Sequence, residues 1–64
     1  MFNFAEEIKR ESLWITRDSR TLRWMKSLSE WEVAGGRGET LYAGKSFMLA
    51  YEMLLTGKID SEED

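Results

Sequence analysis

Residues 31–43 read Trp-Glu-Val-Ala-Gly-Gly-Arg-Gly-Glu-Thr-Leu-Tyr-Ala, and this stretch decides the fold. Apolar and polar side chains alternate on both sides of a loop that contains three glycines. Alternation is typical of a half-buried strand, and glycine supplies the positive φ that tight hairpin turns require. We therefore expect a β-hairpin from Trp31 to Tyr42. The competing interpretation is a single helix over 40–56, which would hold Gly44 in its interior at a cost of about 1 kcal/mol.

The following stretch, 47–56, predicts a helix that is apolar around nearly its whole circumference. Glu52 is its only charged residue. Ser46 precedes it as a candidate N-cap, and Gly57 follows where helices commonly end in the left-handed conformation. A surface helix normally has one apolar face, so this helix needs cover on more than one side.

Projected at 100° per residue, this helix carries three apolar stripes. The first stripe, which is expected to pack on the sheet, consists of Phe47, Ala50, Tyr51 and Leu54. The second consists of Met48 and Leu55, with Ile59 just beyond, and the third of Leu49 and Met53. One small sheet cannot cover all three stripes. Part of the second or third is therefore expected to contact the N-terminal helix or a partner.

At the N-terminus, Phe4 to Glu11 predict a short helix. Asn3 and Glu6 have the spacing of an N-cap residue and its reciprocal acid. Acidic residues in a first turn also suit the helix dipole.

Residues 12–29 fit two structures. The β-forming residues at 13–16 and 21–25, separated by Asp18-Ser19, indicate two strands joined by a turn. Alternatively, Asp18 or Ser19 caps a helix that carries Leu22, Met25 and Leu28. Periodicity cannot separate short segments of this kind, and we favour the strands.

The expected fold class is therefore α+β. A short N-terminal helix is followed by a small antiparallel sheet of three to four short strands, which includes the 31–42 hairpin, and the C-terminal helix packs on that sheet. An all-α three-helix bundle is the alternative. We expect one small domain over residues 1–59 and an acidic disordered tail over 60–64.

Composition excludes several kinds of chemistry. The chain has 64 residues, a formal net charge of -3, and neither cysteine nor histidine. The commonest metal ligand and general base are thus missing, so we expect no catalytic residue, no metal and no cofactor. No apolar run is long enough to cross a membrane, and the first residues lack the apolar core of a signal peptide, so a cytoplasmic location without a membrane partner is expected. Gly44-Lys45-Ser46 does not make a phosphate-binding loop, because Glu39 stands where that motif needs glycine.

Basic side chains recur every third residue in one segment, near Trp14 and Trp24. They are Arg17, Arg20, Arg23 and Lys26. Basic residues interleaved with aromatics suit phosphates and stacked bases, although the acidic net charge works against nucleic acid. The three tryptophans, of which Trp31 is the third, are expected in the core more often than at an interface.

The order strand, hairpin, strand, helix, with Trp31 opening one strand and an aromatic-rich helix closing the unit, resembles known DNA-binding modules in layout. It is similar to the three-stranded-sheet-plus-helix modules of AP2-type and integrase arm-binding domains over about Ser12 to Gly57. Those families read DNA with a basic sheet face. In this chain Trp31, Glu32 and Glu39 stand where more basic side chains would be expected.

The surplus of apolar helix surface favours protein interaction without catalysis. In general character the chain resembles small accessory and inhibitor proteins of phages and mobile elements, which implies binding to a larger protein or self-association, with a homodimer expected. The expected interface residues are Met48, Leu55, Leu49, Met53, Ile59 and Trp24. The expected charged rim is Arg17, Arg20, Arg23 and Lys26. The alternative is a small DNA-binding regulatory module that uses the same basic residues.

Overall fold

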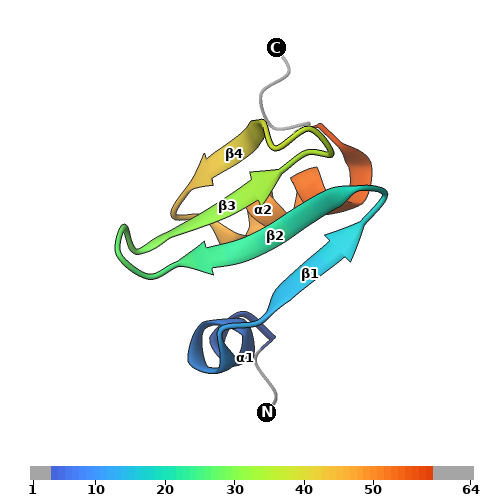
Figure 1. Ribbon diagram of the computed structural model, residues 1–64. Coiled ribbons are helices and arrows are strands. Elements are labelled where there is room, and N and C mark those ends of the chain that lie inside the picture. The colour runs from blue at the N-terminus through green and yellow to red at the C-terminus, as the bar shows by residue number, and fades with distance from the viewer. Residues whose placement is uncertain (1–3, 59–64) are drawn as a thin grey trace.

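The computed structural model describes residues 4–58, which form two helices and four strands. In chain order these are α1 (Phe4–Glu11), β1 (Trp14–Arg17), β2 (Arg20–Met25), β3 (Glu30–Ala34), β4 (Thr40–Gly44) and α2 (Phe47–Thr56). The strands form one antiparallel sheet in the order β1-β2-β3-β4. Figure 1 shows α2 behind the sheet and α1 at the lower end of β1. The expected α+β fold is confirmed and the all-α bundle is wrong; Asn3, Ile59 and the acidic tail lie outside the described residues.

The segment 12–29 forms strands β1 and β2, so its alternative interpretation as a helix is wrong. Asp18 and Ser19 both have positive φ, at 50° and 68°. A two-residue hairpin turn of type I′ has positive φ at both positions, whereas an α-helix requires negative φ. The register places Ile15 opposite Leu22 and Arg17 opposite Arg20.

The predicted hairpin is present as β3 and β4, and a helix over 40–56 is therefore wrong. The pairing shifts register between Val33 and Ala34, which leaves Leu41 as an extra residue on β4. Position 44, the last residue of β4, has room only for glycine, because a Cβ there would lie 2.6 Å from the Tyr42 hydroxyl oxygen. That hydroxyl accepts a hydrogen bond from the Ser46 backbone N–H at 3.3 Å, which ties the end of the strand to the start of α2.

Both ends of α2 have the predicted caps. The Ser46 hydroxyl accepts a hydrogen bond from the Leu49 N–H at 3.2 Å. Gly57 adopts a left-handed conformation, with φ of 82°, and its N–H donates to the Met53 carbonyl at 2.8 Å. These bonds satisfy backbone groups that a helix leaves unpaired at its ends.

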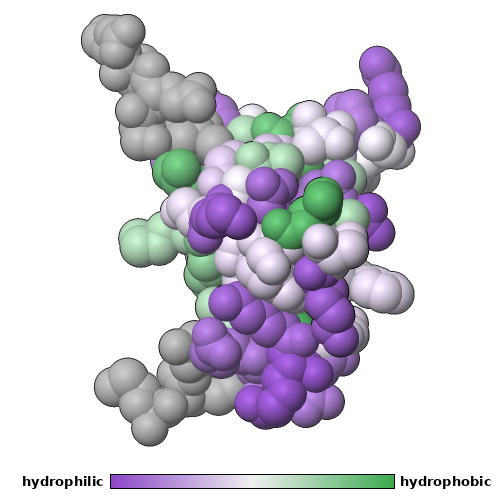
Figure 2. Space-filling model, turned by 90° about the vertical axis from the view of Figure 1, so that its left-hand side faces the viewer, coloured by the Kyte–Doolittle hydropathy of each residue, from purple (hydrophilic) through white to green (hydrophobic). Residues whose placement is uncertain are grey.

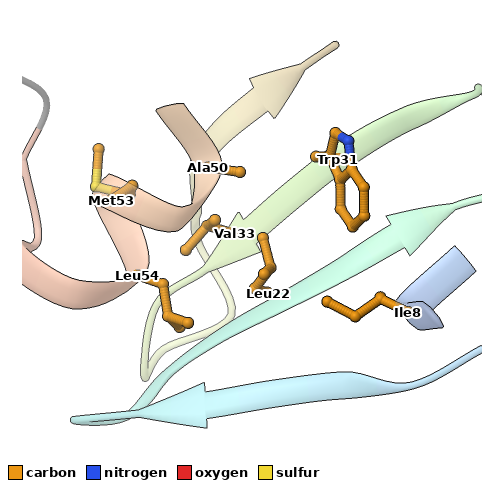
Figure 3. Close-up of a cluster of buried hydrophobic side chains, with 7 residues drawn as sticks. All are labelled: Ile8, Leu22, Trp31, Val33, Ala50, Met53 and Leu54. Carbon is orange, nitrogen blue, oxygen red and sulfur yellow. The ribbon is translucent and has the colours of Figure 1, made fainter. Parts of the chain in front are cut away.

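The core lies between the sheet and the helices. Its buried members are Ile8 from α1, Leu22 from β2, Trp31 and Val33 from β3, and Ala50, Met53 and Leu54 from α2 (Figure 3). The face of α2 that meets the sheet is therefore rotated from the predicted one. Met53 belongs to the core and is only 8% exposed, whereas Tyr51, predicted to pack on the sheet, lies at the helix margin. Because every stripe of this helix is apolar, hydropathy alone does not select the buried one.

Candidate protein-interaction surface

The outward side of α2 is apolar where a surface helix is normally polar. Met48 is 79% exposed, Tyr51 is also exposed, and Leu55 is half-buried. These three residues follow the spacing i, i+3, i+7, which places them along one stripe. We call them the α2 stripe. In Figure 2, hydrophilic side chains cover the α1 end of the molecule at the bottom, and green hydrophobic side chains follow the left margin, the side of α2.

The remaining predicted interface residues are not part of this stripe. Leu49 is half-buried, on another side of α2. Met53 is in the core, so its side chain has little surface to offer a partner. Trp24 is half-buried against the core, and its ring lies edge-on to Trp31 with centroids 4.9 Å apart. Ile59 lies outside the described residues.

An aromatic cluster holds the margin of the α2 stripe in place. Phe47 and Tyr51 stack with ring centroids 5.6 Å apart, and Phe4 from α1 meets both edge-on at 6.3 Å. Phe47 also packs against Trp31 of the core, with ring centroids 4.8 Å apart. The cluster therefore joins α1, α2 and β3, and it fixes Tyr51 beside Met48.

The four predicted basic residues do not form a common surface. Arg20 is only 18% exposed and donates hydrogen bonds to the carbonyls of Leu54 (2.9 Å) and Leu55 (3.3 Å). These are among the last carbonyls of α2, where a cation is favourable to the helix dipole. The Arg20 side chain thus connects β2 to the C-terminal end of α2 by hydrogen bonds. This structural role was not predicted from the sequence.

Arg17 and Arg23 point to opposite faces of the sheet, because Arg17 is paired with Arg20 and positions three apart on a strand alternate. Arg23 lies on the face away from α2, where it contacts the Glu32 carboxylate at 2.8 Å. Glu32 also accepts a hydrogen bond from the Thr40 hydroxyl at 3.3 Å. Lys26 lies in the β2–β3 turn. The regularly spaced basic residues of the sequence therefore lie on separate parts of the molecule.

Trp14 was expected in the core but lies on the surface. It is 69% exposed and lies on the open face of the sheet, beside Arg23 and opposite the helices. Two shallow hollows, of about 380 and 320 Å³, lie against Trp14 and Arg23. The alternation of side chains along β1 could have predicted this position. Ile15 faces the core, so the adjacent Trp14 must face the opposite side of the sheet.

Two features that often mark a chemical site are absent from the described residues. Within residues 4–58, no three carboxylates lie close enough together to hold a metal ion, and no polar or charged residue is buried. In the same part of the chain, no helix is long and apolar enough to cross a membrane.

No known protein family, curated protein or solved structure matches this chain. The sheet has four strands, whereas the DNA-binding modules that its layout resembles have three.

Proposed function

We propose that this protein is a non-catalytic module that binds a larger protein through the α2 stripe of Met48, Tyr51 and Leu55. The observation that carries the proposal is the 79% exposure of Met48 on a helix whose only charged residue is Glu52. Methionine is well suited to such a contact because its flexible side chain adapts to irregular apolar surfaces.

Folding does not require an apolar residue at position 48. Methionine, lysine, glutamate and glutamine have similar helix propensities, so a polar side chain would serve the exposed helix equally well. Burial of a methionine side chain against a partner, by contrast, contributes about 1.5–3 kcal/mol. The exposed methionine therefore has a physical use in binding and none in the isolated fold.

The spacing of the stripe indicates the form of the partner. Anchors at i, i+3 and i+7 on one helix face are the pattern by which amphipathic helices bind apolar grooves. The partner is accordingly a protein with an apolar groove, and the protein acts by occupying that groove. This is consistent with an accessory or inhibitor role, and it requires no catalytic group.

No arrangement of the described residues favours nucleic acid. A strand of DNA needs several cations on one surface, whereas Arg20 is engaged with α2 and Arg23 is engaged with Glu32.

The test is binding by Met48→Asp compared with Leu28→Asp, a matched change at another exposed apolar residue, in the β2–β3 turn. Position 48 lies in the first turn of α2, where an acidic residue suits the helix dipole, so the variant is expected to fold. A partner is first captured from a lysate of the source organism with the wild-type protein, then purified and titrated by calorimetry.

We expect Met48→Asp to weaken binding by about 30-fold or more, as for an interface hot spot, and Leu28→Asp to leave it nearly unchanged. Equal affinity of wild-type protein and Met48→Asp would contradict the proposal. So would binding of duplex DNA whose affinity falls steeply with salt.

A further inference from the structure

Within residues 4–58, no strand covers the outer edge of β1, and this edge has no bulge, proline or lysine. The sheet order leaves β1 with β2 as its only strand partner within residues 4–58, and Figure 1 shows it as the outermost strand on its side. Natural edges are commonly protected by bulges, prolines or lysines. The opposite edge, β4, has a register shift of this kind, whereas Trp14–Arg17 pairs regularly and contains neither lysine nor proline.

The backbone groups on that edge belong to two residues. A two-residue turn makes its flanking pair, Arg17 and Arg20, the hydrogen-bonded kind, and the kinds alternate along an antiparallel ladder. Ile15 therefore bonds to Leu22, while the N–H and C=O groups of Trp14 and Thr16 point away from β2. These outward groups lie symmetrically about Ile15.

We infer that a second copy of this chain adds its own β1 to this edge, antiparallel, about a two-fold axis through Ile15. Trp14 of each copy then lies opposite Thr16 of the partner subunit, and the two pairs exchange four backbone hydrogen bonds. The two sheets become one continuous sheet with both open faces on the same side. The inference concerns a different element from the α2 stripe and does not rest on the proposed function.

Charge and exposure favour this register and this occupant. A two-fold axis through Arg17 would set two arginines directly opposite each other, which is destabilising, whereas the axis through Ile15 sets Arg17 opposite Leu13 of the partner subunit. The same register brings the two Trp14 side chains into diagonal positions on the open face, within reach of each other. The most exposed aromatic residue of the described chain is thereby covered by its own copy.

The first test is sedimentation equilibrium of Thr16→Pro beside Thr16→Ala. Proline removes the outward N–H at position 16 without removing a bond to β2, whereas alanine keeps that N–H. We expect wild type and Thr16→Ala to dimerise alike. Two edge bonds are lost per dimer in Thr16→Pro, so its dimerisation is expected to weaken by about 10–100-fold. Circular dichroism confirms that each variant is folded.

The second test uses cysteine cross-linking, which is clean because the chain contains no cysteine of its own. In the proposed dimer, position 15 faces its own copy in a non-hydrogen-bonded pair, at a Cα separation of about 4.5 Å that a disulfide can span. Position 17 is displaced from its copy by four residues along the strand. Mild oxidation is expected to cross-link Ile15→Cys into a dimer and to leave Arg17→Cys monomeric.

Three results would overturn the inference. They are a wild-type protein that remains monomeric at millimolar concentration, equal cross-linking at positions 15 and 17, and a dimerisation constant of Thr16→Pro equal to that of Thr16→Ala. Unchanged dimerisation of Thr16→Pro together with loss of the dimer in Met48→Asp would assign self-association to the α2 stripe instead. Binding of a different protein through Met48 is measured separately, so either proposal can fail without the other.

Discussion

Replacement of Arg20 by methionine tests whether one side chain holds α2 to the sheet. Methionine keeps most of the aliphatic stem of arginine and removes the hydrogen bonds to Leu54 and Leu55. A hydrogen bond from a charged donor contributes about 1.5–3 kcal/mol. The two bonds share one guanidinium group, and the freed carbonyls at the helix end can be rehydrated. The expected loss of unfolding free energy is therefore about 2–3 kcal/mol in total, not the sum of two full bonds. The ion pair with Asp18 adds little, because that carboxylate is 71% exposed.

Urea denaturation followed by tryptophan fluorescence measures this loss, since Trp31 is buried and reports on the core. In a domain of this size, about 2–3 kcal/mol corresponds to a melting temperature lower by roughly 10–20 °C. The matched control is Arg17→Met, because Arg17 is the register partner of Arg20 but is 57% exposed. We expect the control to change stability by less than about 0.5 kcal/mol. Equal effects of the two substitutions would refute the reasoning.

Two further substitutions test local backbone geometry. Ser19→Gly is expected to stabilise the protein by about 0.5–1 kcal/mol in the same urea assay, because Ser19 has φ of 68° in the β1–β2 turn and glycine adopts it without strain; a loss of stability would contradict this turn geometry. Gly44→Ala is expected to destabilise by about 1–3 kcal/mol, because its Cβ would lie 2.6 Å from the Tyr42 hydroxyl oxygen. This cost should shrink in a Tyr42→Phe background, and an unchanged cost there would show that the hydroxyl is not the obstacle.

The parts of the fold that sequence predicted are those determined by local chemistry. The Gly-rich loop between β3 and β4 and the two caps of α2, Ser46 and Gly57, each depend on residues close in the chain. Predicting this loop and these caps required no knowledge of tertiary contacts. The turn at Asp18-Ser19 was harder, because both residues serve equally well as helix caps and as turn residues.

The parts that sequence missed depend on contacts between distant elements. The structural role of Arg20 depends on its hydrogen bond to Leu54, a residue 34 positions further along the chain. The spacing of Arg20 from Arg17 and Arg23 suggested that the three arginines share one surface. Successive side chains of a strand point to opposite faces, so Arg20 and Arg23 of β2 lie on different faces of the sheet. The rotation of α2, which buries Met53 in place of Tyr51, follows from the position of the sheet and not from the hydropathy of the helix.

The small core makes association and stability inseparable in this protein. Seven side chains are buried among the described residues, and domains near this size are marginally stable. Association of the folded form adds stability that grows with the concentration of the partner, by about 2.7 kcal/mol at 100 times Kd. A dimer through β1 therefore predicts a melting temperature that rises with protein concentration in wild type and Thr16→Ala. In Thr16→Pro the same rise is expected only at a protein concentration about 10–100-fold higher. This dependence separates loss of the dimer from simple damage to the fold, because damage to the monomer lowers the melting temperature by a similar amount at every concentration.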